Sequence, residues 1–383
     1  MGILLPVELH RHFGAGMSPT LVSVLAQKNC VSKIKDRKGR IVTGYDPRCQ
    51  EDILRYYDDV AKTISLTRGQ LRFEKFLDSS GLPVSVILAI EDLEYAAYEQ
   101  AREQAARGML HIELRLSPYA YAREIFARPT DTYVMTADIQ HVIRAVQHGL
   151  LRASRDFNIS SFLIVAFSRQ NTATQSYRII EAILNADTPV GFDLAGIEYG
   201  FTPSEYIELL APLRDAGVPI TIHVGEQGTP PAYTECPARA ISECVTLLGA
   251  RRIGHGTSAV TSLEVMTFLR DEGIYLECCP LSNVHLGYVP RNSHPLKEFL
   301  AHGVKATLST DDPLMFGTVT VADVAAKCQD FLCLSQEDQN VLTLNAIAGA
   351  FVNTETKRKL TTRYLYLLRS SAPNQQCIDK DLL

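Results

Sequence analysis

The stretch Val-Pro-Ile-Thr-Ile-His-Val-Gly-Glu, residues 218–226, decides the fold and indicates the chemistry. It begins as an apolar, β-branched run that is typical of a buried strand, and it ends by presenting His223 and Glu226. Reactive groups at the carboxyl ends of several strands are the pattern of an active site on a (β/α)8 barrel. Three other apolar runs end in comparable polar clusters, at residues 9–12, 254–256 and 309–313.

Strands and helices alternate along the chain with a repeat of roughly 30 residues, as right-handed βαβ units require. The strands are rich in valine, isoleucine, leucine and phenylalanine, which suits strands covered on both faces. We therefore predict an α/β fold, a (β/α)8 TIM barrel, in a single domain over residues 1–383. The strands are expected at 5–13, 109–116, 161–167, 189–195, 218–226, 252–255, 273–279 and 304–308. The helices between strands two and eight are expected at 136–157, 176–185, 203–216, 238–248, 263–271 and 295–302.

Residues 14–107 form a predicted helical insertion between strands one and two, well placed to act as a lid over the barrel mouth. Its basic stretch, residues 28–40, is best interpreted as a solvated surface loop, with anion binding as the alternative. Residues 321–383 are expected to form a helical tail outside the barrel. The helices of the insertion are expected at 20–28, 51–64, 68–77 and 83–107.

Composition excludes several classes of protein. A net charge of −5 gives no reason to expect a nucleic-acid or membrane surface. No apolar stretch reaches the roughly 18 residues of a spanning helix, and the first residues lack the features of a signal peptide. The nine cysteines have no framework spacing and indicate thiols in a reducing compartment. We therefore expect a cytoplasmic protein that acts on a small molecule; the sequence carries no signal for an oligomeric state.

Four candidate metal ligands stand at strand ends. His10 and His12 share one face of strand one because strand side chains alternate, while His223 ends strand five and Asp311 follows strand eight. Three imidazoles and a carboxylate suit Zn²⁺, and Fe²⁺ or Mn²⁺ would also be accepted on geometry. A His-x-His pair alone could be structural. The full set favours one catalytic zinc per chain, with a position left for water.

Three further groups are expected beside this metal. In a closed apolar pocket Glu226 would have a raised pKa and could act as a general acid; the alternative is a glutamate at a helix N-terminus. His255, between two glycines, could reach the metal-bound water as a base or an electrostatic anchor. Asp312 could recognise the substrate, or it could bond the amides of its own loop.

Seven motifs follow one another along the chain: Val7-Glu8-Leu9-His10-x-His12, Glu113-Leu114-Arg115-Leu116-Ser117-Pro118, Asp193-Leu194-Ala195-Gly196, His223-Val224-Gly225-Glu226, Gly254-His255-Gly256, Pro280-Leu281-Ser282-Asn283 and Ser309-Thr310-Asp311-Asp312-Pro313. Together they resemble the motifs of the adenosine deaminase family of the amidohydrolase superfamily. The resemblance implies a zinc (β/α)8 barrel that hydrolyses the 6-amino group of a purine and releases ammonia.

The resemblance also implies roles for individual residues. Glu226 would protonate purine N1 while zinc hydroxide adds to C6, and His255 would orient that hydroxide. The backbone of Gly196 would meet N3 and Asp312 would meet N7. The implied zinc ligands are His10, His12, His223 and Asp311, and His12 and Gly14 also count as substrate-binding positions.

The sequence departs from the family pattern on the ribose side of the pocket. The family usually has Leu-Asp-Gly after the second histidine, where the aspartate holds the 5′-hydroxyl; residues 13–15 here are Phe-Gly-Ala. Residues 194–198 read Leu-Ala-Gly-Ile-Glu in place of Leu-Ala-Gly-Asp-Glu, and the basic loop is an addition to the lid. Gly14 would remove an anchor and open space. Adenosine or deoxyadenosine is the expected substrate. The alternatives are a 5′-modified adenine compound, such as AMP, N6-modified AMP, 5′-methylthioadenosine or aminodeoxyfutalosine, and free adenine.

Two competing functions have recognisable signatures. A two-metal amidohydrolase that cleaves amides or phosphoesters usually carries a lysine at the end of strand four, and strand four here offers Asp193 and Gly196 instead. A non-catalytic relative would be expected to have lost a ligand or the acid, and this sequence keeps them all. Both features favour the deaminase.

Overall fold

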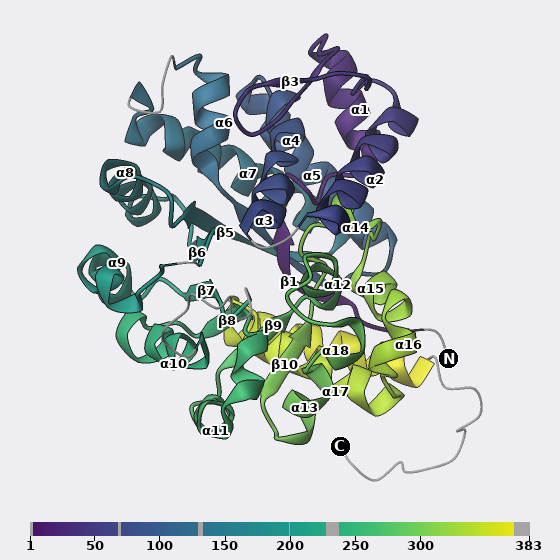
Figure 1. Ribbon diagram of the computed structural model, residues 1–383, viewed down its shortest axis with the longest axis vertical. Helices are drawn as coiled ribbons and strands as arrows, with labels where there is room; N and C mark the ends of the chain where they lie inside the picture. Colours follow the sequence, from purple (N-terminus) through teal and green to yellow (C-terminus); the bar gives the residue numbers. More distant parts are fainter. Residues whose placement is uncertain (1–2, 68–69, 129–132, 199, 227–236, 371–383) are drawn as a thin grey trace.

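The computed structural model describes residues 3–67, 70–128, 133–198, 200–226 and 237–370, and it has an eight-stranded parallel sheet at its centre (Figure 1). The strands pair in the order in which they occur along the chain, with one helical segment or more between neighbours. This is the predicted (β/α)8 barrel. Its strands are β1 (Val7–His12), β4 (His111–Leu116), β5 (Ser160–Ser168), β6 (Gly191–Ala195), β7 (Ile220–Val224), β8 (Arg252–His255), β9 (Tyr275–Cys278) and β10 (Lys305–Leu308).

The first and last strands meet through a candidate metal ligand. Arg11 and Asp311 form a parallel β-bridge just beyond β10. The amide of His12 donates to the carbonyl of Asp311 over 3.0 Å, and the amide of Asp311 donates to the carbonyl of His10 over 2.9 Å. Closing the barrel therefore places the Asp311 loop directly beside the two histidines of β1.

Helices surround the sheet, and two of the predicted ones have the predicted bounds. The helix expected at 136–157 is α7 (Thr136–Phe157), and that at 263–271 is α11 (Leu263–Asp271). The others that follow strands are α6 (Pro118–Ile125), α8 (Ala173–Leu184), α9 (Ile207–Asp215), α10 (Pro237–Leu248), α12 (Pro280–His285), α13 (Leu296–Ala301) and α14 (Pro313–Phe316). The last helices are α15 (Val321–Lys327), α16 (Gln329–Leu332), α17 (Gln336–Gly349) and α18 (Thr354–Ser370).

The insertion after β1 folds as helices and one small hairpin at one end of the barrel, drawn in purple and blue in Figure 1. We call residues 14–107 the lid. A two-stranded hairpin of β2 (Ile34–Lys35) and β3 (Ile41–Val42) was not expected from the sequence. The lid helices are α1 (Pro19–Lys28), α2 (Gln50–Leu66), α3 (Gln70–Asp78), α4 (Gly81–Ser85) and α5 (Ile90–Ala106).

The prediction of one continuous helix over residues 83–107 is wrong. The chain leaves α4 and starts again at α5 because Asp92 accepts hydrogen bonds from the amides of Leu88 and Ala89, each over 3.0 Å. These bonds satisfy amide groups just before a new helix begins. The side chain of Asp92 thus starts the new helix α5 within a stretch whose sequence pattern is helical throughout.

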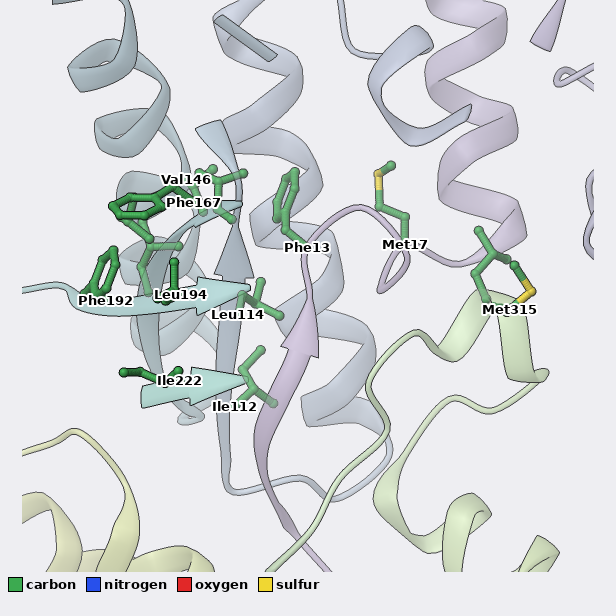
Figure 2. Packing of buried hydrophobic residues seen from close by; sticks show 14 of the residues in the cluster. Phe13, Met17, Ile112, Leu114, Val146, Phe167, Phe192, Leu194, Ile222 and Met315 are labelled. Atoms are coloured by element: carbon green, nitrogen blue, oxygen red, sulfur yellow. The ribbon is translucent and has the colours of Figure 1, made fainter. Parts of the chain in front are cut away.

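Strand β4 shows how the barrel divides its residues between two environments. Ile112, Leu114 and Leu116 belong to the main apolar cluster, whereas Glu113 and Arg115 are buried and charged. Figure 2 shows Ile112 and Leu114 packed with neighbouring apolar side chains. Because strand side chains alternate, the charged set faces the other side of the sheet, the barrel interior. β4 is covered on both faces, as expected, but its interior face carries charged side chains.

The final helix covers the far end of the barrel. Leu360 and Tyr364 from α18 pack with Val7 and Leu9 from β1 in a second, smaller apolar cluster. Among the described residues, no helix combines the length and apolar character needed to cross a bilayer.

Candidate active site

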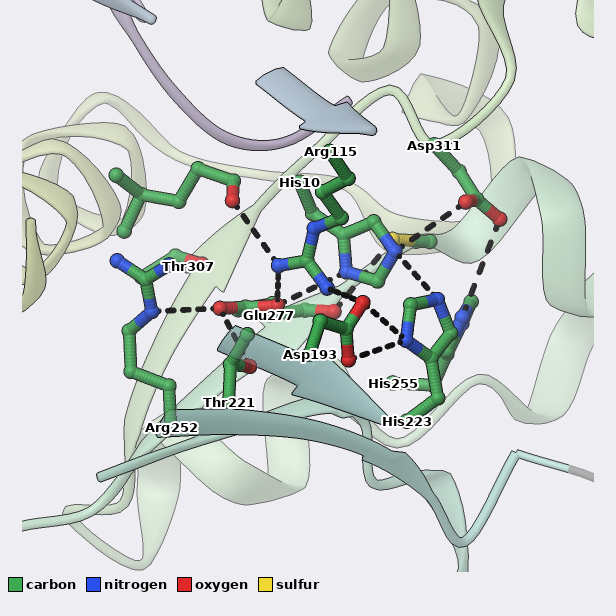
Figure 3. A network of polar contacts seen from close by, with 12 residues as sticks. His10, Arg115, Asp193, Thr221, His223, Arg252, His255, Glu277, Thr307 and Asp311 are labelled. Carbon is green, nitrogen blue, oxygen red and sulfur yellow. Dashed lines mark hydrogen bonds and ion pairs between the residues drawn. The ribbon is translucent and has the colours of Figure 1, made fainter. Parts of the chain in front are cut away.

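The carboxyl ends of β1, β7 and β8 bring imidazoles together. The ring centroids of His10 and His223 lie 4.5 Å apart, and His255 lies 5.0 Å from His10 and 5.1 Å from His223. His12 joins them from the end of β1, with its ring centroid 5.3 Å from that of His223. Residues separated by more than two hundred positions in the sequence thus share one small space, as Figure 3 shows for three of them.

Four side-chain atoms of this group surround a single point. The Nε2 atoms of His10 and His223 are 3.0 Å apart, and those of His12 and His223 are 3.3 Å apart. Oδ1 of Asp311 lies 3.3 Å from Nε2 of His10 and 3.2 Å from Nε2 of His12. The structure therefore brings together the four residues predicted as metal ligands.

Carboxylates fix the protonation of two of these rings. Nδ1 of His10 lies 2.9 Å from Glu277, and Nδ1 of His223 lies 2.9 Å from Asp193. Because a carboxylate only accepts, each Nδ1 must donate, and each neutral ring is left with a lone pair on Nε2. Burial lowers the pKa of His223 to about 4 against the opposing effect of Asp193, so its ring is neutral at pH 7.

The positions of these donor atoms fit a bound metal ion. Two Nε2 lone pairs that face each other across 3.0 Å repel unless a cation lies between them. The carboxylate of Asp311 adds a negative charge at the same point. Three imidazole nitrogens and one carboxylate oxygen are a donor set that suits zinc. The site fits a divalent metal.

A chain of buried charges lies behind the imidazoles (Figure 3). Arg115 pairs with both Glu277 and Asp193, and Arg252 pairs with Glu277 over 2.6 Å, all with fully buried side chains. Burial alone would raise the pKa of Glu277, but Arg115 and Arg252 hold that pKa well below its usual value. The two carboxylates therefore stay ionised and keep orienting the rings. Glu277 is not among the predicted residues, although a glutamate inside the apolar run 273–279 is a signal for it.

Glu226 stands at the end of β7 in a buried setting with an exposed fraction of 4%. Its amide and that of Gly225 donate to the carboxylate of Glu198 over 2.9 and 2.8 Å, which fixes the turn that leaves the strand. Burial raises the pKa of Glu226 well above its usual value, and the charges of Asp311 and Glu198 add to the rise. The side chain is thus an acid that keeps its proton near neutrality.

His255 presents a proton rather than a lone pair to the site. The amide nitrogen of Asn283 lies 3.1 Å from Nδ1 of His255, and its amide oxygen lies 3.3 Å from Nε2 of His294. The Asn283 amide therefore donates to Nδ1, and burial lowers the pKa of His255 well below its usual value. The neutral ring must carry its proton on Nε2, which lies 3.7 Å from Glu226 and 4.0 Å from Asp311. This favours an orienting role over metal ligation.

The backbone at the site is strained in two places. His255 has φ of 64° and Asp311 has φ of 61°, the left-handed region that side chains with a Cβ rarely adopt. Such conformations cost on the order of 1–3 kcal/mol each and persist only where the surroundings fix them. Two backbone hydrogen bonds to β1 do so for Asp311. The strain coincides with two of the predicted site residues.

The two predicted purine contacts also lie at strand ends. Gly196 follows β6 with φ of 94°, and a Cβ there would come within 2.5 Å of the Ser168 hydroxyl oxygen, so the close approach requires glycine. Asp312 is buried next to Asp311. Burial raises the pKa of Asp312 to about 7, with Asp311 adding to the rise and His12 opposing it. Near neutral pH this carboxyl can therefore carry a proton and donate it in a hydrogen bond.

The expectation that Gly14 opens space is wrong. A Cβ added at this glycine would lie 2.9 Å from the hydroxyl oxygen of Tyr121 and 3.0 Å from Cβ of Pro83. Both distances are shorter than ordinary van der Waals contact. Tyr121 comes from α6 and Pro83 from α4, so the lid and the segment after β4 close over the end of β1. An aspartate at this position could not be accommodated without moving them.

The basic residues 28–40 fold against carboxylates instead of facing an open mouth. Lys28 pairs with Asp92 over 2.5 Å. Arg40 pairs with Asp36 over 2.6 Å and with Asp78 over 3.3 Å. Longer pairs join Lys35 to Glu124 and Arg37 to Asp78, each over 3.9 Å. Four of the basic side chains are thus neutralised within or beside the lid, which favours the solvated-loop interpretation.

The sequence comparisons identify the family. Residues 6–365 match the model of the adenosine deaminase family. The chain belongs to the adenosine deaminase family. An adenosine deaminase of Klebsiella pneumoniae (strain 342) is 32% identical over 310 residues, which cover 80% of this chain and 87% of that protein. The protein is therefore a hydrolytic purine deaminase, as the motifs predict.

Solved structures agree with this membership. An adenine deaminase from Arthrobacter aurescens superposes with a TM-score of 0.78 at 26% identity and covers 96% of this chain and 100% of its own. A zinc-bound amidohydrolase from Burkholderia ambifaria superposes with a TM-score of 0.74 at 22% identity, covering 96% of this chain and 92% of its own, and shows the same fold. Deaminases of this type depend on a metal, and two groups of side chains here could hold one: the buried His10, His223, His255 and Asp311, and the partly buried His12 with Asp311 and Asp312.

Proposed function

We propose that this family member is a zinc-dependent deaminase that converts the 6-amino group of adenosine or an adenosine derivative to the 6-oxo group. The observation that carries the proposal is the pair of opposed Nε2 lone pairs on His10 and His223, 3.0 Å apart beside Asp311. One zinc ion per chain would be held there by His10, His12, His223 and Asp311. The bound ion would supply Lewis-acid activation of the attacking water.

The chain's own residues supply the proton chemistry. Glu226, with its raised pKa, donates a proton to purine N1, which makes C6 electrophilic. His255 uses its Nε2 proton to orient the attacking oxygen. Water adds to C6, the bond to the 6-amino nitrogen breaks, and ammonia leaves with the 6-oxo purine. These preorganised groups act where charge develops in the tetrahedral transition state.

Two contacts would hold the ring in register. The backbone amide of Gly196 would donate to N3, because no side chain blocks the approach. Asp312, protonated near neutral pH, would donate to N7. Donors on both edges of the ring would distinguish an adenine from other amidines.

The alternative substrates share hydrolysis at C6. They differ beyond the purine ring, and N6-modified AMP also differs at the 6-amino nitrogen, so it would release the corresponding amine in place of ammonia. Gly14 supplies no carboxylate for a 5′-hydroxyl, which keeps 5′-modified adenine compounds among the candidates. Free adenine is supported by the likeness to the adenine deaminase of Arthrobacter aurescens, and adenosine by the likeness to the Klebsiella pneumoniae enzyme.

The test is a turnover assay of the zinc-loaded protein on a panel of adenine compounds. The panel contains adenosine, deoxyadenosine, AMP, N6-methyl-AMP, 5′-methylthioadenosine, aminodeoxyfutalosine and adenine, and the ultraviolet change of deamination is followed. We expect adenosine to be deaminated with kcat/KM above about 10⁴ M⁻¹ s⁻¹. If no compound of the panel is turned over by protein that contains zinc, the proposal fails.

A further inference from the structure

We propose that Tyr57 and Tyr121 form a wall of uncharged hydrogen-bond donors that receives the part of the substrate beyond the purine ring. This wall selects an uncharged, oxygen-bearing group such as a ribose over a phosphate. The inference rests on the proposed function and deepens it, because it names the class of group that is recognised at the ribose side.

Tyr121 comes from α6 and lies beside the end of β1, the strand that carries two candidate ligands. Its hydroxyl oxygen is 2.9 Å from the position of a Cβ on Gly14, two residues after His12. Its ring packs edge-on against Phe13, with the centroids 5.7 Å apart, so the phenol is held in place. The side chain has an exposed fraction of 4%, and its hydroxyl has no hydrogen-bond partner within the described part of the chain.

Tyr57 reaches the same region from the lid. It belongs to α2, which contacts α12 and α14, the short helices that follow β9 and β10. Burial raises the pKa of the Tyr57 phenol, and Tyr56, Asp312 and Tyr121 add to the rise, as expected of groups in one part of the structure. Its exposed fraction is 4%, and it too lacks a hydrogen-bond partner among residues 3–67, 70–128, 133–198, 200–226 and 237–370.

Buried hydroxyl groups are normally hydrogen-bonded, and leaving one without a partner is unfavourable. The hydroxyl oxygens of Tyr57 and Tyr121 are not among the fully buried atoms without a partner in the described residues, so each keeps some access to solvent although its side chain is buried. Each hydroxyl can therefore meet a ligand that enters beside Gly14. Burial raises the pKa of both phenols, so they stay protonated and offer an O–H donor. The partner must present an acceptor oxygen.

The charges around the wall favour a neutral partner. Arg40 and Lys35 of the lid are paired with carboxylates, and Arg11 donates to the carbonyls of Val319 and Gly16. None of these cations is left for a phosphate. A ribose hydroxyl meets both conditions.

The experiment removes one hydroxyl at a time. We would measure kcat/KM of the zinc-loaded wild type, Tyr121→Phe and Tyr57→Phe for adenosine, its 2′-, 3′- and 5′-deoxy analogues, AMP and adenine. The controls are two neighbouring tyrosines. Tyr119 shares α6 with Tyr121, and its hydroxyl lies 3.5 Å from Arg178. Tyr56 packs its ring 5.1 Å from that of Tyr57, a contact that phenylalanine keeps, and its charged neighbours include Asp36 and Asp78. The control variants are Tyr119→Phe and Tyr56→Phe. Thermal melting would confirm that each variant is folded.

We expect at least one of the two wall variants to lose about 10-fold in kcat/KM for adenosine, the scale of one hydrogen bond. The same variant should lose nothing with adenine, or with the deoxy analogue that lacks the bonded oxygen. AMP should be a poorer substrate than adenosine in the wild type. The two control variants should behave as the wild type with every compound.

Other outcomes overturn the inference in distinguishable ways. Equal losses with adenosine, the deoxy analogues and adenine would show a structural role for the phenols, and unchanged values would show no role. A wild type that prefers AMP or adenine to adenosine would reject an uncharged ribose as the selected group. A folded, zinc-loaded wild type that deaminates none of the compounds would overturn the proposed function and this inference together.

Discussion

Inside the barrel, Arg115 and Arg252 have fully buried side chains and face the carboxylate of Glu277, whereas in the lid Arg40 keeps 61% of its side chain exposed beside Asp36. Removing one partner of a buried pair leaves an uncompensated charge in a medium that cannot solvate it. Exposed pairs contribute about 0–1 kcal/mol, because water already solvates both partners.

The charged residues of the two regions therefore have different roles. The buried charges of the barrel orient the rings of His10 and His223 through Glu277 and Asp193. Several charged residues of the lid pair with one another, as Arg40 does with Asp36 and Asp78. The lid meets the helices after β9 and β10 through a hydrogen bond from Arg72 to the carbonyl of Leu286 and through aromatic groups, with Phe76 stacked near Phe316 at 6.3 Å. Replacing a charged residue of the barrel interior should therefore lower catalytic activity, whereas replacing a charged residue of the lid should leave it nearly unchanged.

Removing the metal should have the largest effect. A strong chelator should abolish turnover, and added Zn²⁺ should restore it, because four donors converge on one point without another cation between them. Elemental analysis of the active protein should find about one zinc per chain. Full activity in protein that contains no divalent metal would contradict the assigned ligands.

The next largest effect is expected for Glu226→Gln. Glutamine keeps the shape and removes the acid, so kcat should fall by at least about 10²-fold. Zinc content should stay unchanged, since Glu226 is not among the ligands. A variant with turnover near that of the wild type would assign the proton donor elsewhere.

The same substitution should alter how stability depends on pH. The pKa of Glu226 is raised by burial and by neighbouring carboxylates from 4.5 in the unfolded chain, so the folded protein favours the protonated form. The stability from this group is complete below the unfolded value and is lost as the pH rises through the folded pKa. Glutamine cannot ionise. Above pH 4.5 the Tm of the wild type should therefore fall as the pH rises through the folded pKa, and the Tm of Glu226→Gln should fall less.

A smaller effect on catalysis is expected for Glu277→Gln, which tests the barrel side of the comparison. The change removes one carboxylate partner from Arg115 and from Arg252, which keep Asp193 and Glu113 respectively, and it weakens the acceptor for Nδ1 of His10. Zinc affinity should fall by about 10–100-fold, and the free energy of unfolding by about 3 kcal/mol. The matched control is Glu272→Gln, an exposed glutamate at the end of α11, which should change neither quantity.

The smallest effect is expected for Arg40→Ala in the lid. The guanidinium is exposed, and when it is removed the buried carboxylate of Asp36 keeps the hydrogen bonds from the amides of residues 38 and 40. The free energy of unfolding should therefore change by less than about 1 kcal/mol. kcat/KM for adenosine should stay within about two-fold. A large selective loss with AMP would show that the basic loop binds phosphate and would remove the contrast between the two regions.

The sequence predicts most of the barrel because the strand signals are local. The strand expected at 252–255 has those bounds as β8, and the others begin or end within a few residues of the expected positions. The lid is predicted less well. The hairpin of β2 and β3 and the break between α4 and α5 depend on short turns and on hydrogen bonds to Asp92, which periodicity does not reveal.

The sequence by itself determined that His10, His12, His223 and Asp311 stand at strand ends, since the residue type and the end of an apolar run can both be read along the chain. Only the tertiary structure decided what lies behind and above them. Glu277 meets His10 across 267 positions, and Tyr121 fills the place beside Gly14. Such contacts depend on where the closed barrel and its lid place distant segments, and the distance along the chain carries no information about that.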